Sequence, residues 1–242
     1  MNTDSQIIEV SGLAVHVVRK NIKNLHLSVC PPDGKVRVSA PQRTSNENVR
    51  LAVISRLPWI KRKKAEFEKQ PRQSERHYVS GESHYFQGRR YILELVERSG
   101  PPEFQLLNNA KMRLSVRPDT PKDKRAQIVN EWYRDHLKEV IPSLLKKWQP
   151  IVGKQVSAWR IQKMKTKWGS CNIEAKRILL NLELAKKSPE CLEYILVHEL
   201  VHLHERHHND NFVRLMDRFM PKWRISRDIL KSEPLAHEEW EY

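Results

Sequence analysis

One segment of the chain, LVHELVHLHERHHNDNF at residues 196–212, contains five of its eleven histidines. Three residues in it, His198, Glu199 and His202, form the pattern H-E-x-x-H. Residues four apart on an α-helix are separated by only about 40° around the helix axis, so the two imidazoles point to the same side. The pattern therefore predicts a helix at this position, and it predicts that the helix offers two nitrogen ligands to one metal ion.

The start of this helix is marked by Ser188, a good N-cap residue, followed by Pro189 at the first helical position. The apolar run at 195–197 indicates a buried helix that holds its ligands rigidly. Glu199 is offset by about 100° from His198, which places its carboxylate beside the open coordination position of the metal. There it can take a proton from a bound water. We expect the helix to end near residues 205–206.

A catalytic zinc ion takes three protein ligands and a water, so the motif requires a third ligand. His204 follows the second histidine by only two positions and faces the other side of the helix, where we expect it to be exposed or hydrogen-bonded. His208 gives the spacing H-E-x-x-H-x-x-x-x-x-H, which metzincins also use, although those enzymes have glycine at the position of Glu205. We predict that His208 is the third ligand. The alternatives are His207 and a downstream carboxylate, Glu233 or Glu238.

The composition is that of a globular protein, with 39% hydrophobic and 30% charged residues among 242. Lysine and arginine number 44 against 29 acidic residues, a net charge of +15, which is consistent with a nucleic acid or nucleotide partner as well as with simple solubility. No apolar run is long enough for a transmembrane helix.

Cysteine usage and the first residues indicate a compartment. The three cysteines, Cys30, Cys171 and Cys191, are widely spaced and form no C-x-x-C pair, which argues against a disulfide framework and fits a reducing cytosol. The segment MNTDSQIIEVSG has neither a basic start nor an apolar stretch, so we expect no secretory signal and a cytoplasmic protein.

Alternating apolar residues predict a β-rich first half. Three hairpins are expected, with turns at Asp33-Gly34, at Gly88 and at Asn108-Asn109. A helical pattern lies between the first two hairpins at 46–69, and Pro58 should kink or divide it. The sequence shows no internal repeat.

The pattern changes to a helical period near residues 117–121. A long amphipathic helix is predicted after Thr120 as N-cap, then short strands near 156–164 and 177–184, the H-E-x-x-H helix, and a last helix carrying Phe212. We therefore predict an α+β protein with a β-hairpin-rich portion at 1–119, containing one helix, and a catalytic portion at 120–242.

A second unusual string, RIQKMKTKWGSCN at 160–172, has no simple periodicity. Gly169 predicts a close backbone approach or a positive φ, and Trp168 could form the wall of a pocket. Cys171 could lie near the metal as a thiolate, but a small buried residue is the favoured interpretation.

Several strings together resemble the YgjP-like family of predicted zinc metallopeptidases, which is related to the SprT and WLM zincins. They are KTKWGSC, LLNLEL, LVHELVHL with its following HH and F, and MPKWRISRDIL; in the first half, DGKVRVSAP, PWIKRK and GRRYILEL are similar too. The matching positions are Trp168, Gly169, Ser170, Cys171, Asn181, His198, Glu199, Leu200, His202, His208 and Phe212. The chain departs from the family pattern at His207, where the family often has asparagine, and at Val213, where it often has tryptophan.

The resemblance implies a minimal zincin-like metallopeptidase domain preceded by the β-rich portion, with substrate lying along a sheet edge. It implies a zinc-dependent hydrolase of peptides or proteins, with Zn²⁺ held by His198, His202 and His208 and with Glu199 as general base. Two alternatives keep the metal: a hydrolase of nucleotides or other phosphate esters, and a nucleic-acid-associated protein with a structural zinc. Glu199 weighs against the last, because a structural site does not need it.

Overall fold

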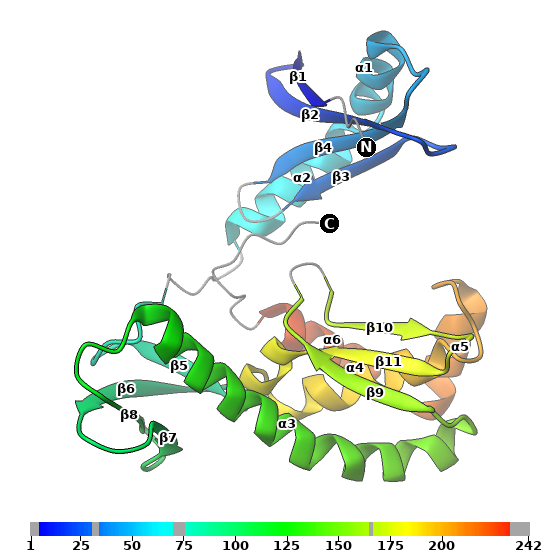
Figure 1. Cartoon of the computed structure of the whole chain (residues 1–242). Coiled ribbons are helices and arrows are strands. Elements are labelled where there is room, and N and C mark those ends of the chain that lie inside the picture. Colours follow the sequence, from blue (N-terminus) through cyan, green and yellow to red (C-terminus); the bar gives the residue numbers. More distant parts are fainter. Residues whose placement is uncertain (1–4, 31–33, 70–75, 165–166, 233–242) are drawn as a thin grey trace. The chain divides into compact units, whose positions relative to one another are not determined.

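The computed structural model describes residues 5–30, 34–69, 76–164 and 167–232 (Figure 1). The chain divides into two compact units, Met1–Arg72 with Glu238–Tyr242, and Gln73–His237. Helices and small sheets occur in both units, so the predicted α+β class is confirmed. Over the described ranges, none of the helices has the length and apolar character needed to cross a bilayer.

The first unit is a four-stranded sheet followed by two helices. Its elements are β1 (Ser5–Val10), β2 (Leu13–Lys20), β3 (His26–Cys30), β4 (Lys35–Pro41), α1 (Asn46–Ile54) and α2 (Leu57–Lys69). The strand order is β1-β2-β4-β3, with β2 and β4 parallel and the other pairs antiparallel. Pro58 lies in the first turn of α2, so the predicted helix at 46–69 is divided, as expected. Alternate valines of the strands and three helix residues form the core.

The second unit begins with another four-stranded sheet. Its strands are β5 (Ser83–Phe86), β6 (Arg89–Glu97), β7 (Glu103–Leu106) and β8 (Lys111–Val116). The antiparallel pairs β3–β4, β5–β6 and β7–β8 confirm the three predicted hairpins. Asp33, in the first predicted turn, lies outside the described residues. Gly34 and Gly88 have φ angles of 65° and 77°, a conformation that favours glycine.

The two sheets repeat one topology. The order β5-β6-β8-β7, with β6 and β8 parallel, reproduces the order and pairing of β1 to β4. Even the first turns agree, since Ser11-Gly12 and Gln87-Gly88 both have positive φ. The expectation of no internal repeat was therefore wrong. The copies share buried positions and turn conformations but few identical residues, so the repetition is difficult to recognise in the letters of the sequence.

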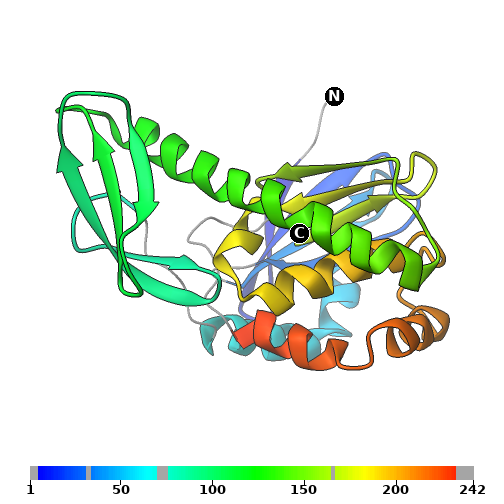
Figure 2. The same ribbon diagram turned by 90° about the horizontal axis from the view of Figure 1, so that it is seen from below.

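The helix α3 (Lys122–Val152) follows β8 and links this sheet to the rest of the unit (Figure 2). Its buried side chains recur at three- and four-residue steps: Val129, Tyr133, Leu137, Ile141, Leu145, Trp148 and Val152. The N-cap is Pro121 rather than Thr120. The Thr120 hydroxyl donates to the carbonyl of Arg117 at 2.6 Å, within the turn that precedes the helix.

The remaining elements surround the H-E-x-x-H segment. They are β9 (Ala158–Gln162), β10 (Gly169–Asn172), β11 (Arg177–Asn181), the 3-10 helix η1 (Leu182–Lys186), α4 (Pro189–Val201), α5 (Asp210–Phe219) and α6 (Trp223–Ser232). Their sheet has the order β10-β11-β9, so β10 is an edge strand. The predicted boundary at 119/120 lies inside the second unit, where one buried cluster extends from Phe86 to Leu230.

The β5–β6 turn contacts the segment that leads into α4. The amides of Gln87 and Gly88 donate to the carbonyls of Ala185 and Lys186 at 3.0 and 3.1 Å. A Cβ atom at Gly88 would lie 3.0 Å from the Cβ of Ser188, the N-cap of α4. The start of the H-E-x-x-H helix is therefore held by backbone bonds to the first sheet of its unit.

Candidate metal centre

The helix α4 carries the first part of the site. It begins at Pro189 after Ser188, as predicted, but it ends at Val201 rather than near Glu205. His202 is its C-cap and keeps right-handed helical angles, with φ −60° and ψ −19°. The amide of His202 donates to the carbonyl of His198 at 3.2 Å, so the two histidines keep the four-residue helical relation that the motif requires.

Three imidazoles converge at the end of this helix. The Nε2 atom of His198 lies 3.2 Å from Nε2 of His202 and 2.9 Å from Nε2 of His208. One ligand atom from each of the three residues lies within 4.8 Å of the others. His208 comes from the turn before α5, so the chain reverses direction after α4 and brings it back to the first two histidines.

Two contacts hold this arrangement in place. The ring of Phe212 in α5 lies under all three imidazoles, with centroid distances of 4.8 Å to His198, 4.7 Å to His202 and 4.8 Å to His208. The Nδ1–H of His202 donates to the carbonyl of Glu205 at 3.0 Å. That bond leaves Nε2 of His202 as the bare nitrogen, which is the form that binds a metal.

The turn between α4 and α5 is braced by the Glu205 side chain. Its carboxylate accepts hydrogen bonds from the amide of His207 and from Nδ2 of Asn211, both at 3.1 Å. The hydrogen bond from Asn211 is the largest cause that lowers the pKa of Glu205, and the bond from the amide of His207 is the next largest. Asn209 caps α5 by accepting from the amide of Phe212 at 3.0 Å. These bonds fix the position from which His208 reaches the site.

The other histidines of the segment lie elsewhere. His204 donates through Nε2 to the carbonyl of Val152 at 2.7 Å, which confirms the expectation that it faces away from the pair in α4. His207 is exposed and is not part of the group of converging imidazoles. Glu233 and Glu238, the predicted carboxylate alternatives, lie outside the described residues.

The environments of His198 and His202 favour neutral imidazoles. Burial, followed by His202 and His208, lowers the pKa of His198 to about 3. Burial is also the largest cause that lowers the pKa of His202. A metal binds the neutral imidazole, so the folded chain presents these residues in the required form.

Glu199 is almost completely buried, with 4% of its surface exposed. Burial raises the pKa of its carboxyl group to about 8, against the opposing charge of Lys167. Its Oε2 atom has no hydrogen-bond partner among the described residues, and the same holds for Nδ1 of His198. A buried carboxylate oxygen without a partner next to three convergent imidazoles indicates a site for water or substrate.

The strand β10 runs past Glu199. A Cβ at Gly169 would lie 2.5 Å from Oε1 of Glu199, which confirms the predicted close approach; the φ of Gly169 is not positive. Burial and then Glu199 raise the pKa of Cys171 to about 11, so this half-buried cysteine is a thiol rather than a thiolate.

Asn181 is a residue whose role the sequence did not reveal, although it belongs to the matched family pattern. It is fully buried. Its Nδ2 donates to the carbonyls of Met164 and Lys167 at 2.9 and 2.8 Å, and its Oδ1 accepts from the amides of Met164 and Glu183 at 3.3 and 3.2 Å. Its own amide donates to the carbonyl of Trp168 at 2.9 Å. Four of these five bonds fix the segment that enters β10, and the bond from Glu183 caps η1.

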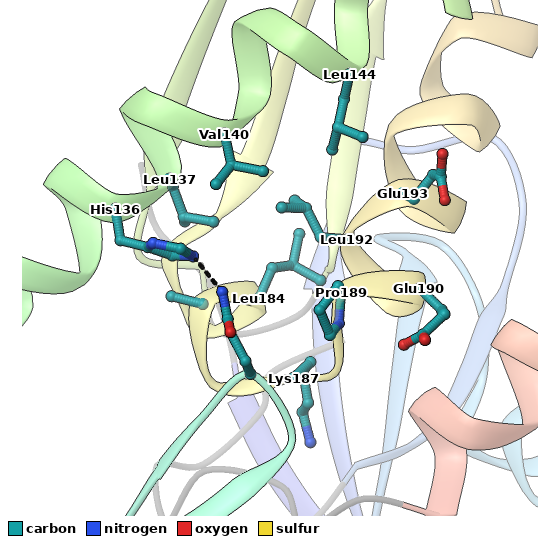
Figure 3. A pocket seen from close by; sticks show the side chains of 12 residues that line it. His136, Leu137, Val140, Leu144, Leu184, Lys187, Pro189, Glu190, Leu192 and Glu193 are labelled. Carbon is teal, nitrogen blue, oxygen red and sulfur yellow. Dashed lines mark hydrogen bonds between the residues drawn. The ribbon is translucent and has the colours of Figure 1, made fainter. Parts of the chain in front are cut away.

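A cavity of about 190 Å³ lies near the N-terminal end of α4 (Figure 3). Its apolar lining includes Leu137, Val140 and Leu144 of α3 (Figure 3). His136 and Gln87 also line it, and their side-chain nitrogens are 3.2 Å apart. None of the three convergent histidines lines it, so it is separate from the candidate metal centre.

The donor set fits a zinc ion. Nitrogens bound to a tetrahedral zinc at 2.0–2.1 Å lie roughly 3.3 Å apart, and two of the Nε2 separations, 3.2 and 2.9 Å, are close to this value. An α+β unit with three convergent imidazoles and a buried glutamate beside them has the features of a metal-dependent hydrolase.

The family assignment agrees with this class. The family model described as "YgjP-like, metallopeptidase domain" matches residues 23–233. The chain therefore belongs to the YgjP-like metallopeptidase family, as the sequence resemblance suggested.

Two further comparisons complete these findings. Among solved structures, the crystal structure of the metallopeptidase zymogen of Pyrococcus abyssi abylysin is similar over 37% of this chain and 88% of that chain, at 27% sequence identity and a TM-score of 0.34. A similarity at that TM-score does not establish a common fold. No curated protein matches the chain significantly.

Proposed function

We propose that the chain is a zinc-dependent peptidase in which His198, His202 and His208 hold the metal. The convergence of their Nε2 atoms carries this proposal. When bound, zinc would lower the pKa of a water ligand to about 7 and polarise a scissile carbonyl group. The family indicates peptides or proteins as substrates, and no comparison supports a nucleic acid or nucleotide. The catalytic portion at 120–242 and a cytoplasmic location remain predictions.

Glu199 acts as the general base in this proposal. Its Oε2 atom is buried and without a partner in the described part of the chain, so it can accept a proton from the attacking water. Once protonated by the water, the Glu199 carboxyl group can return that proton to the leaving amine. One residue thus serves as base and then as acid.

The test compares the wild type with a Glu199→Gln variant and a matched Glu190→Gln control at an exposed position of α4. Each protein is loaded with zinc, its metal content is measured, and its cleavage of fluorescein-labelled casein is followed. Loss of a general base lowers the rate by about 10²- to 10⁴-fold, so we expect that loss in Glu199→Gln alone, with zinc content unchanged. Full casein cleavage by Glu199→Gln would overturn the role of Glu199. Phosphate release from nucleoside triphosphates, lost in that variant, would replace the peptidase assignment with the phosphohydrolase alternative.

A further inference from the structure

Gly169 lies at the start of β10, against the side chain of Glu199. A Cβ atom at Gly169 would lie 2.5 Å from Oε1 of Glu199 and 2.8 Å from both its Cδ and its Cγ. Cβ atoms essentially never approach other heavy atoms within 3.0 Å. Because the φ of Gly169 is not positive, its backbone conformation does not require glycine. Glycine is required instead because the Glu199 side chain occupies the space that a Cβ atom would need.

The strand cannot move away to make room for a side chain. Asn181 holds the segment that enters β10 through its bonds to Met164, Lys167 and Trp168. Beyond Gly169, β10 pairs with β11 in an antiparallel register that begins at Gly169 and Leu180. Leu180 is itself fully buried. A shift of β10 would therefore break buried hydrogen bonds.

The helix on the other side is equally restrained. Leu196, Val197, Leu200 and Val201, the apolar residues of α4 around Glu199, are fully buried. Protein interiors are close-packed, so a helix with such neighbours does not shift without opening cavities. The Glu199 side chain is therefore the part of the contact that can move most easily. Its Oε2 atom makes no hydrogen bond within the described ranges, so packing against Gly169 is what restricts the carboxylate on this side.

We propose that Gly169 is a positioning residue for the reaction. Because it has no side chain, the backbone of β10 packs directly against the Glu199 carboxylate and sets its position. This inference rests on the proposed role of Glu199 as general base. It also gives a physical reason for the glycine in the string KTKWGSC. A methyl group at this position pushes the Glu199 carboxylate out of the place that it occupies against β10. No imidazole atom is among the three atoms nearest to that methyl group.

The first experiment measures zinc content and casein cleavage for Gly169→Ala and for Ser170→Ala. Ser170 is the matched control, because successive side chains of a strand point to opposite faces. A displacement of about 1 Å in a catalytic group costs on the order of 100-fold in rate. We expect a fall of that size in kcat for Gly169→Ala, with KM and zinc content unchanged, and wild-type kinetics for Ser170→Ala. Unchanged kcat in Gly169→Ala, or loss of its zinc, would overturn the inference.

A double-mutant cycle gives a second readout that needs neither metal nor activity. All three of the nearest atoms to the added methyl group belong to Glu199, and Glu199→Ala removes them. Thermal unfolding is measured on the metal-free wild type, Gly169→Ala, Glu199→Ala and the double variant. We expect Gly169→Ala to lower Tm when Glu199 is present and to leave Tm unchanged when it is absent. Equal shifts in both backgrounds would show that the methyl group contacts something else and would refute the inference.

The two proposals fail in different ways. If Glu199→Gln keeps full activity, the proposed base is wrong whatever Gly169→Ala does. If Glu199→Gln is inactive while Gly169→Ala has wild-type kcat and the cycle shows no coupling, the base stands and the positioning role of Gly169 is wrong.

Discussion

Replacement of Asn181 by alanine should strongly destabilise the second unit. The side chain makes four hydrogen bonds, two as donor to the carbonyls of Met164 and Lys167 and two as acceptor from the amides of Met164 and Glu183. Each buried hydrogen bond contributes about 1 kcal/mol to stability. Their combined loss is therefore on the order of 4 kcal/mol, a large part of the roughly 5–15 kcal/mol that stabilises a typical domain.

The loss is measured by thermal and urea unfolding of the full chain. In a unit of this size about 1 kcal/mol shifts Tm by roughly 2–4 °C, so we expect Asn181→Ala to lower Tm by about 10 °C. Asn172→Ala is the matched control in the same sheet. Asn172 is exposed and accepts one bond, from the amide of Ala175 at 2.9 Å, and its loss should cost no more than about 1 kcal/mol.

An Asn181→Asp variant separates the donor role from the acceptor role. Aspartate keeps oxygens for the two amides but places an oxygen against the two carbonyls that the Nδ2 of Asn181 now satisfies. We expect it to be no more stable than Asn181→Ala. The reasoning is refuted if Asn181→Ala costs no more than Asn172→Ala, or if Asn181→Asp is as stable as the wild type.

Three further predictions concern other parts of the second unit. His208→Ala should lose stoichiometric zinc. His204→Ala removes a bond to a backbone carbonyl and the stacking on Phe219, and it should keep zinc; equal zinc content in both variants would contradict the choice of third ligand. Burial lowers the pKa of His84 from 6.5 to about 4, so the unfolded chain binds the extra proton and stability falls as the pH drops from 6.5 towards 4. His84→Gln should flatten the dependence of the urea midpoint on pH, and an unchanged slope would refute this. Gly88→Ala should destabilise the protein by about 1–2 kcal/mol because of the positive φ, and further because the methyl group meets the N-cap of α4. Gly153 also has a positive φ but has open space around it, so Gly153→Ala should show the first cost alone. Equal urea midpoints for the two variants would argue against the contact at Gly88.

The hairpins and the long helices could be predicted because each buries one face in a regular pattern. Val36, Val38 and Ala40 alternate in β4, and Met112 and Leu114 alternate in β8, so the period of two is visible in the sequence. The strand β10 was not predicted. Its four residues, GSCN, include a glycine and have no apolar alternation, and its pairing with β11 becomes visible only in three dimensions.

The candidate site was predictable where it depends on spacing along one helix. His198, Glu199 and His202 are related by helical geometry alone, and their motif could be read directly. The length of α4 was overestimated because the turn after Val201 continues with polar residues that carry no clear stop signal.

Other features of the site depend on contacts between distant elements. Phe212 lies under the three imidazoles because α5 packs back against α4, and Asn181 reaches Met164 and Lys167 across a turn. A single sequence shows that such residues are present, but it does not show which atoms they meet.

The repeated arrangement of β1 to β4 and β5 to β8 has a consequence for the origin of the chain. Two consecutive copies of one strand order are what a tandem gene duplication would leave behind. The copies differ in their C-terminal helices: α1 and α2 are separate short helices, whereas α3 is one helix of 31 residues. Its second half extends past the sheet to η1 and α4. In the second copy this long helix provides a surface on which the histidine-bearing helix rests.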